Sequence, residues 1–378
     1  GDVTNAPDGE DLTTDENRLL KIANRSTLFG KGYKILRRNV DLVSQFNQEN
    51  TIYEIRYDFD LGGETLNIPA GCTLKFEGGS FKNGVLNCNN TYISGTIDCL
   101  TDITKIQGRI ISTINLSWIG IYGDNPYNSS RIKNLGKIPA TSVKVDSPIT
   151  FNEGDIMLPS SITIDGNNYW LSFTCSTCEH GLICLSDRVV LENIKITVPP
   201  SNVDFDKPVI LADTRISNPH VFRLSNILVD SYNSTGKAKD TGLKIIASND
   251  KENSKQNYIT GCHITNCRFE NFKIGIEVDC INKEYTSGEK NYSWLNNIYF
   301  DNLYVSAEEY GILTNYEDNA VYNPSNSCGP VFIHNYLFQA QDKDNAMSFS
   351  HSGNWELYID SGRHYDSNYK GVVHSGTV

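Results

Sequence analysis

From Thr51 onward, short apolar runs alternate with Gly, Asn, Asp and Pro. Within runs such as residues 73–76 and 161–164, apolar and other side chains alternate at every step. A period of two that ends at turn residues predicts many short β-strands. The first fifty residues differ, because acidic and apolar positions predict a short amphipathic helix over 13–22 and a second near 41–48. We therefore expect an all-β chain with a short N-terminal α-helical lead-in.

Five segments share the order apolar, any, Asn, apolar, any, apolar. They are residues 191–196, 224–229, 264–269, 295–300 and 333–338, and their Asn residues are 33, 40, 31 and 38 positions apart. One such repeat cannot bury its own apolar side chains, so repeats must stack and share one interior. An Asn at the same bend of every coil can form an amide ladder. The pattern predicts a single-stranded right-handed parallel β-helix, with an ordinary β-sandwich as the alternative.

The change of pattern along the chain suggests three parts. We expect a lead-in or cap over residues 1–50, N-terminal β-strand coils over 51–117, and the main parallel β-helix over 118–378. The irregular repeat length indicates loops of variable length at one corner, where insertions are tolerated and function is often found.

Three segments carry a resemblance to a known family. Residues 68–76 and 158–166 both place a Pro before a strand pattern, and residues 118–124 run Trp-Ile-Gly-Ile-Tyr-Gly-Asp. Together with the repeated Asn, this resembles the entry segment of pectate-lyase-like (pectin-lyase-like) β-helix proteins and phage tailspikes, from Leu61 to the end of the chain. The resemblance implies a solenoid that is secreted or displayed at the cell surface. It leaves activity open, because such folds include hydrolases, lyases, epimerases and inactive adhesins.

Composition excludes several partners. The formal net charge is −12, whereas nucleic acids and anionic membranes need a basic surface. We expect no membrane span, because no apolar run reaches about 18 residues. Cys175 and Cys178 form one C-x-x-C without a second pair at zinc-binding spacing, so we expect buried thiols or one or two disulfides. We predict no bound metal and no cofactor, with Ca²⁺ as the one ion the acidic positions could accommodate.

The repeat also predicts which side chains share the outer face. The fourth residue after each Asn places Asp230, Glu270 and Asp301 in one column, with Arg268 and Tyr299 beside it. Carboxylates on neighbouring strands, about 5 Å apart, suit the paired acids of a glycosidase. Arg268 also suits a polysaccharide lyase, in which carboxylate-bound Ca²⁺ acidifies a proton that a basic side chain removes. Tyr299 could stack on a sugar ring.

A second group of outward residues lies on the strand predicted over 275–279. Glu277 and Asp279 point away from the interior, and Asn315 is expected to stack on Asp279 in the next coil. Carboxylates and an amide in this arrangement suit a sugar or a Ca²⁺ ion.

These patterns favour a carbohydrate-active β-helix that hydrolyses a complex polysaccharide with paired carboxylates. The alternative is a non-catalytic binder of glycans or host glycoproteins, such as an adhesin, a tailspike-like protein or a passenger-type domain. A Ca²⁺-dependent lyase ranks third. The expected partner is a polysaccharide or glycan, and we expect a monomer, with a trimer as the alternative.

Overall fold

The computed structural model describes residues 32–139, 142–175, 177–198, 206–231, 239–249, 257–282, 293–318, 328–340, 347–352, 355–360, 363–365 and 373–375. The helix predicted over 13–22 lies outside these residues. The chain divides into two compact units, one formed by Gly1–Ile121 with Lys133–Asp146 and the other by Tyr122–Ile132 with Ser147–Val378.

The first unit is a set of short strands with one turn of α-helix. Its strands are β1 (Gly32–Ile35), β2 (Thr51–Ile55), β3 (Phe59–Asp60), β4 (Thr65–Asn67), β5 (Thr73–Phe76), β6 (Phe81–Lys82), β7 (Val85–Ser94), β8 (Lys105–Ile110), β9 (Ile114–Asn115) and β10 (Ser142–Lys144). Helix α2 (Leu42–Gln45) begins after Asp41, whose Oδ2 accepts a hydrogen bond from the Ser44 backbone N–H at 2.8 Å. The helix expected near 41–48 is therefore confirmed as a single turn. The 3₁₀ helix η2 (Leu116–Ile119) lies in this unit, and η3 (Ile132–Lys137) begins at its boundary.

The second unit contains the longer strands. After α3 (Asn128–Arg131) come β11 (Ile149–Phe151), β12 (Ile156–Met157), β13 (Thr163–Asp165), β14 (Trp170–Phe173), β15 (Ile183–Cys184), β16 (Val189–Thr197), β17 (Ile210–Asp213), β18 (Phe222–Asp230) and β19 (Lys239–Ser248). They are followed by β20 (Asn257–Thr265), β21 (Arg268–Asn282), β22 (Ser293–Asp318), β23 (Cys328–Ala340), β24 (Met347–Ser352), β25 (Trp355–Ile359), β26 (Arg363–Tyr365) and β27 (Val373–Ser375). The prediction of an all-β chain is confirmed for the described residues.

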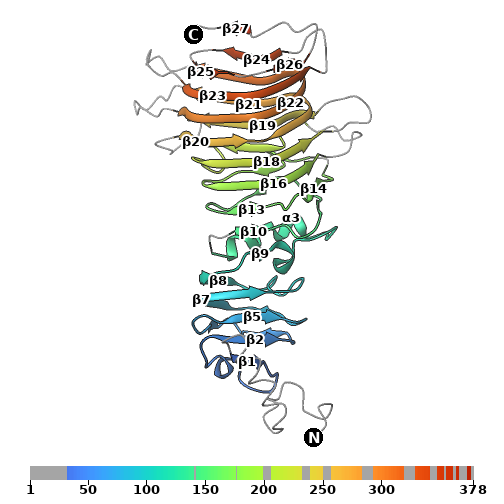
Figure 1. Ribbon diagram of the computed structural model, residues 1–378, viewed down its shortest axis with the longest axis vertical. Coiled ribbons are helices and arrows are strands. Elements are labelled where there is room, and N and C mark those ends of the chain that lie inside the picture. Colours follow the sequence, from blue (N-terminus) through green and yellow to red (C-terminus); the bar gives the residue numbers. More distant parts are fainter. Residues whose placement is uncertain are drawn as a thin grey trace. The chain divides into compact units, whose positions relative to one another are not determined.

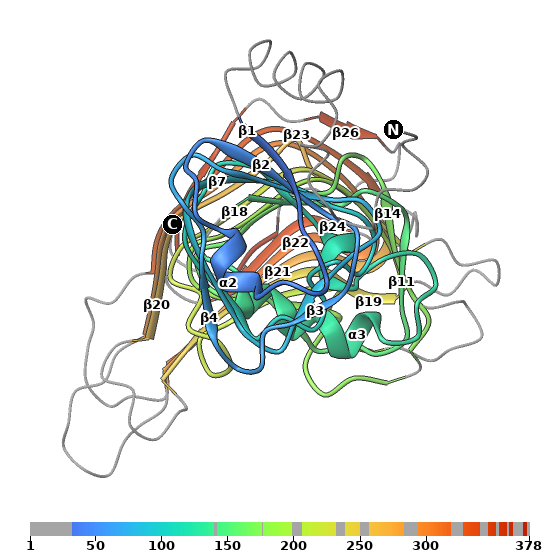
Figure 2. The same cartoon turned by 90° about the horizontal axis from the view of Figure 1, so that it is seen from below.

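In the second unit, strands from successive repeats lie above one another and run parallel (Figure 1). Paired residues on successive strands are 22 to 40 positions apart in the sequence. One aligned set, which we call a column, contains Thr163, Val190, Arg223, His263, Tyr299, Phe332 and Tyr358. Seen end-on, the strands of this unit surround a common interior (Figure 2).

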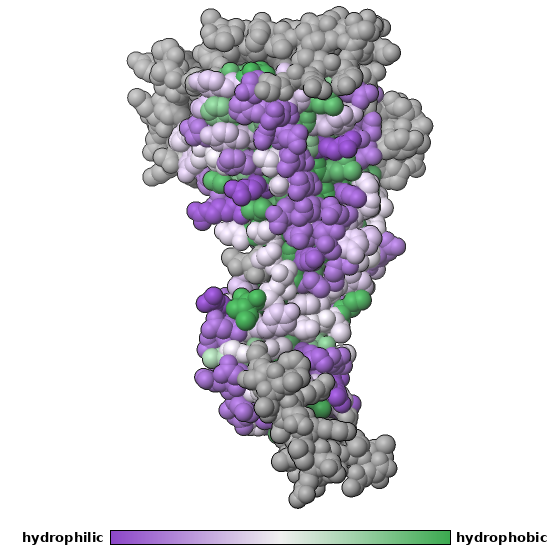
Figure 3. Space-filling model, viewed as in Figure 1, coloured by the Kyte–Doolittle hydropathy of each residue, from purple (hydrophilic) through white to green (hydrophobic). Residues whose placement is uncertain are grey.

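The interior is built from the apolar positions of the repeat. The residue two before each bend is at most 1% exposed, as in Leu191, Leu224, Ile264, Phe300 and Ile333. Burying one such side chain contributes about 2 kcal/mol to folding. Their outward neighbours leave the face of this unit seen in Figure 3 mostly hydrophilic.

The bends themselves use left-handed backbone. The bend residues have φ between 48° and 56°, a region that Asn tolerates better than most non-Gly residues; they are Asn193, Asn226, Asn266, Asn302 and Asn335. The amide of Asn226 donates to Asn193 Oδ1 at 3.0 Å, and that of Asn302 donates to Asn266 Oδ1 at 2.6 Å. Parts of the column thus form the expected amide ladder, although Asn335 donates to Asp301 Oδ1 instead, at 3.0 Å.

The prediction that Asn297 belongs to the amide ladder was wrong. Strands β20 and β22 align Thr265 with Asp301, which places Asn302 opposite Asn266. Asn297 instead lies opposite Gly261, and both of these residues also have positive φ. Residues 300–305 repeat the apolar, any, Asn, apolar, any, apolar order five positions after residues 295–300. Two bends therefore occur on the same strand, and the one chosen from the sequence belongs to a different corner.

Candidate functional site

Two outward columns follow the Asn bend of the second unit. The first contains Trp170, Lys195, Leu228, Arg268, Tyr304 and Leu337, and the second contains Ser172, Thr197, Asp230 and Glu270. Beyond Glu270 the register shifts between Phe269 and Phe272, and the second column resumes with Ser306 opposite Gln339. We call Asp230, Arg268, Glu270, Tyr304 and Gln339 the Arg268 strip.

Arg268 organises this strip. Its Nη2 lies 2.5 Å from Glu270 Oε1, and its Cζ lies 4.8 Å from the centre of the Tyr304 ring. Tyr304 in turn donates its hydroxyl hydrogen to Gln339 Oε1 at 2.6 Å. Burial and the Glu270 charge raise the pKa of Tyr304 above its usual 10.0, while Arg268 opposes them. The phenol therefore stays protonated at neutral pH and acts as a hydrogen-bond donor.

Asp230 and Glu270 are neighbours across strands β18 and β21. Each carboxylate already has a partner: Asp230 Oδ1 accepts from Asn271 Nδ2 at 2.8 Å, and Glu270 accepts from Arg268. Both side chains are half-buried, so solvent reaches them. The arrangement is a set of oriented donors and acceptors beside an aromatic ring.

The structure corrects two residues of the predicted carboxylate column. Asp301 aligns with Thr265 and His334, in a column on the other side of the Asn bend, and so does not stand with Asp230 and Glu270. Tyr299 aligns with His263 and Phe332 and does not flank Arg268. Both errors follow from choosing Asn297 as the bend, which displaces every later position on β22 by five residues.

Tyr304 and Gln339 were not predicted as members of the strip. A signal was present, because Tyr304 stands two positions after Asn302 in a segment that fits the repeat. Gln339 stands four positions after Asn335, where the repeat places an outward residue, but nothing in the sequence indicated its bond to Tyr304.

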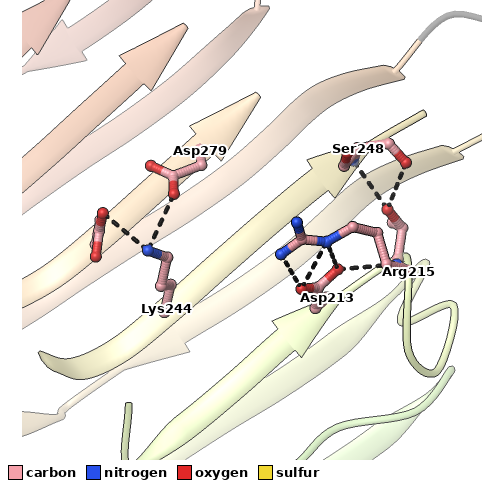
Figure 4. A network of polar contacts seen from close by, with 7 residues as sticks. Asp213, Arg215, Lys244, Ser248 and Asp279 are labelled. Carbon is pink, nitrogen blue, oxygen red and sulfur yellow. Dashed lines mark hydrogen bonds and ion pairs between the residues drawn. The ribbon is translucent and has the colours of Figure 1, made fainter. Parts of the chain in front are cut away.

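The second predicted group is brought together. Asn315 aligns with Asp279 and donates to its Oδ1 at 2.9 Å. Lys244 on the preceding strand lies 3.0 Å from Glu277 Oε1 and 3.2 Å from Asp279 Oδ2 (Figure 4). Burial lowers the pKa of Lys244, but the charges of Asp279 and Glu277 outweigh it and raise that pKa above 10.5. Lys244 occupies the place where a bound cation would be expected to lie.

A further charged pair lies close by on the same sheet (Figure 4). Arg215 Nη2 approaches Asp213 Oδ2 at 2.6 Å, and Arg215 Nε lies 3.0 Å from Asp213 Oδ1. Asp213 is 2% exposed. The Thr214 hydroxyl donates to the Ser248 carbonyl at 3.2 Å and accepts from the Ser248 N–H at 2.9 Å. These contacts hold the turn after β17 against β19, and we assign them a structural role.

Aromatic rings form two stacks on the outer face. His263, Tyr299, Phe332 and Tyr358 follow one another with ring centres 4.7, 4.7 and 5.1 Å apart and planes within 16° of parallel. Tyr258 and Trp294 form a second stack at 5.0 Å and 7°. The spacing equals the separation of neighbouring strands, so the stacks result from the register.

No group of three or more His, Cys, Asp or Glu among the described residues is arranged to hold a metal ion. The nine cysteines whose side chains are described are all free thiols. Burial raises the pKa of Cys178 to about 12, with Asp155 and Cys175 adding to the effect, so this part of the C-x-x-C is not poised for redox chemistry.

In the described part of the chain, no helix has the length and apolar character needed to cross a membrane.

Comparison with protein-family models, curated proteins and solved structures found no match to this chain.

Proposed function

We propose that the second unit is a right-handed parallel β-helix of the pectate-lyase-like or tailspike-like kind. Three features support this: parallel pairing between successive repeats, columns that keep their register through many strands, and left-handed Asn at one bend. A solenoid of this kind presents long rows of side chains at strand spacing. Extended polymers are suitable ligands for such rows.

We propose that the chain binds a glycan along the Arg268 strip. The observation that carries this proposal is the chain of contacts Glu270–Arg268–Tyr304–Gln339, a half-exposed row of oriented polar groups around one aromatic ring. Sugars offer both hydroxyl groups and apolar ring faces, which such a mixed surface can contact. The net charge of −12 favours neutral or basic glycans over polyuronates.

Binding ranks above cleavage because the carboxylates of the strip are already engaged. A glycosidase needs one carboxyl group to give up a proton and another to attack or to activate water. Glu270 is bonded to a guanidinium and Asp230 to an amide, and the third predicted carboxylate, Asp301, lies in another column. The arrangement therefore suits recognition better than acid–base chemistry.

The test is a binding screen of purified protein against neutral, basic and acidic polysaccharides, followed by variants. Arg268→Met and Tyr304→Ala should each weaken binding about tenfold, since each removes a cation–π contact and a hydrogen bond. The matched control is the pair Arg131 and Tyr127, whose cation–π distance is 5.4 Å on a different segment. Arg131→Met and Tyr127→Ala should bind like wild type. Unchanged affinity in both strip variants would reject this site.

Hydrolysis remains the second candidate, because Asp230 and Glu270 are aligned on adjacent strands, whose backbones lie about 5 Å apart, and a retaining glycosidase uses two closely spaced carboxyl groups. The same screen should then measure new reducing ends. Hydrolysis at this site is supported if the wild-type protein releases reducing ends and if Glu270→Gln and Asp230→Asn each abolish that release. An unsaturated product that forms only with Ca²⁺ would instead favour the lyase. Binding without any product supports recognition alone.

We propose that the protein acts outside the cell or on its surface. This rests on the resemblance of residues 118–124 and of the repeated Asn to secreted or surface-displayed β-helix proteins. The buried thiols are compatible with an oxidising environment, because burial raises the pKa values of Cys262 and Cys267 to about 12 and so slows their reaction. Labelling intact producing cells with a membrane-impermeant amine reagent tests this. Labelled protein supports surface display, and recovery from the medium supports secretion.

A further inference from the structure

A second pair of a cation and an aromatic ring lies in the same outward column as Arg268 and Tyr304. Lys195 Nζ lies 5.7 Å from the centre of the Trp170 ring, and the two residues are aligned on strands β16 and β14. Both side chains are half-buried, so solvent reaches them. The column thus repeats one chemical motif, and the Arg268 strip contains only one of its two occurrences.

The Lys195 ammonium group is available to a ligand. Arg268 is bonded to Glu270, whereas in the described part of the chain no carboxylate lies within ion-pair distance of Lys195 Nζ. An ammonium group carries three hydrogen-bond donors, and the hydroxyl and ring oxygens of sugars accept from such donors. The Trp170 ring beside it adds flat apolar area. Trp170 and Lys195 therefore offer the same two kinds of contact as Tyr304 and Arg268.

The side chains around the two pairs continue the surface between them. Leu228 is half-buried and lies between the pairs in the first column, where it can pack against the C–H face of a sugar ring. The second column begins with the half-buried hydroxyl residues Ser172 and Thr197, which can bond to sugar hydroxyls. Asp230 and Glu270 follow them and repel acidic sugars, so the surface favours neutral ones.

The register sets the direction and the length of this surface. Trp170, Lys195, Leu228, Arg268 and Tyr304 occupy successive strands, so the column crosses the strands and spans four strand spacings, about 19 Å. In an extended β-1,4-linked glycan, each pyranose ring advances the chain by about one strand spacing. Successive sugars then meet successive side chains of the column. An α-1,4-linked glycan curves, so its sugars leave the column after a short distance.

We propose that the glycan at the Arg268 strip is an extended, neutral, β-linked chain that crosses the strands to a second subsite at Trp170 and Lys195. This inference rests on the glycan binding proposed above and adds the class of glycan and its direction on the protein. A chain of about five sugars is needed to reach from Tyr304 to Trp170. A longer chain makes both contacts at once, so affinity should depend on chain length.

Calorimetric titration of the full chain with cello-, manno- and xylo-oligosaccharides of two to eight sugars tests the length dependence. In at least one of these β-linked series, affinity should rise about tenfold or more between three and six sugars and then level off. Malto-oligosaccharides, which are α-1,4-linked, should show no such rise. Absence of the rise in all three β-linked series overturns the inference. If Arg268→Met and Tyr304→Ala still weaken binding of a polysaccharide retained in the screen, the strip itself stands; if they do not, both proposals are rejected.

Variants at the second subsite show where the added affinity arises. Trp170→Ala and Lys195→Met should each lower the ratio of six-sugar to three-sugar affinity at least about threefold, whereas Tyr304→Ala should weaken binding of both lengths. The matched control is Tyr57→Ala in the first unit, where Arg38 Cζ lies 4.1 Å from the centre of the Tyr57 ring. This control should keep the wild-type ratio. A wild-type ratio in both subsite variants overturns the inference, and unfolding midpoints establish that each variant is folded.

Discussion

At the scale of single residues, backbone conformation decides which side chains the bends accept. Asn occupies bend after bend because its short polar side chain tolerates positive φ and its amide can bond to the residue one strand away. The same side chain thus satisfies the local geometry and joins neighbouring strands. Hydrophobic pattern alone would not require Asn at these positions.

This dual role gives a prediction for Asn302. Asn302→Ala should lower the free energy of unfolding by about 2 kcal/mol, combining left-handed strain with the lost bond to Asn266. Asn302→Gly should cost less, since Gly accepts the same φ and only the bond is lost. Urea unfolding of the two variants measures the difference. Equal costs would mean that the backbone conformation contributes nothing.

Lys244 illustrates a charge that is needed for stability. Lys244→Met should destabilise the fold by about 3 kcal/mol, because it leaves the buried Asp279 and the half-buried Glu277 without their cation. Lys273 is the control: its 3.7 Å pair with Glu309 is nearly half-exposed on both sides. Lys273→Met should therefore cost under about 1 kcal/mol. Similar losses in both variants would show that burial of the Lys244 pair is unimportant.

The Lys244 effect should depend on pH in one direction. Because folding raises the pKa of Lys244 above 10.5, its stabilisation is fully present below pH 10.5 and is lost as pH rises through the folded-state pKa. The difference in unfolding free energy between wild type and Lys244→Met should be constant from neutral pH to pH 10.5. It should become smaller above pH 10.5. Urea unfolding over a pH series measures the gap. A gap that widens at alkaline pH contradicts the assignment.

At the scale of strands, close stacking limits the size of side chains at certain positions. A Cβ on Gly275 would lie 2.1 Å from Val305 Cγ1 and 2.8 Å from the Gly311 carbonyl oxygen. Gly275 is a buried residue of strand β21, and both atoms belong to the paired strand β22, so neither can move without disturbing the register.

Gly275→Ala should accordingly destabilise the second unit by about 3 kcal/mol through overpacking. Gly261 provides the contrast, because nothing lies within 4 Å of a Cβ built there and its φ is +66°. Gly261→Asn should be nearly neutral, since Asn297 holds the same bend on the next strand. Thermal unfolding, followed by circular dichroism, would compare the midpoint temperatures of the Gly275→Ala and Gly261→Asn variants. A Gly261→Asn variant as unstable as Gly275→Ala would refute this distinction.

At the scale of the whole molecule, the thiols report how well the interior is closed. Burial raises the pKa of Cys88 to about 11 and that of Cys99, Cys262 and Cys267 to about 12. Only the thiolate reacts readily, so these side chains should resist alkylation at neutral pH in the native protein and react on unfolding. Peptide-level mass spectrometry after a timed pulse of iodoacetamide measures each site. Rapid native labelling of Cys262 would show that the interior opens easily.

The sequence by itself predicted the all-β class, the apolar positions that line the interior and the use of Asn at bends. These features follow from local rules: alternation within a strand, and the few residue types that accept positive φ. The neighbouring positions of Asp230 and Glu270, and the contact of Asn315 with Asp279, were also predictable, because the repeats that carry them were aligned correctly.

Only the tertiary structure decided the alignment of β22. Its two Asn motifs stand five residues apart, and Ile298, Phe300, Leu303 and Val305 are all at most 2% exposed, so burial does not distinguish them. Pairing with β20, β21 and β23 selects Asn302 and thereby moves Asp301 and Tyr299 to another facet while bringing Tyr304 to Arg268. A local pattern repeats along one strand, whereas register is settled by hydrogen bonds to the strands on both sides.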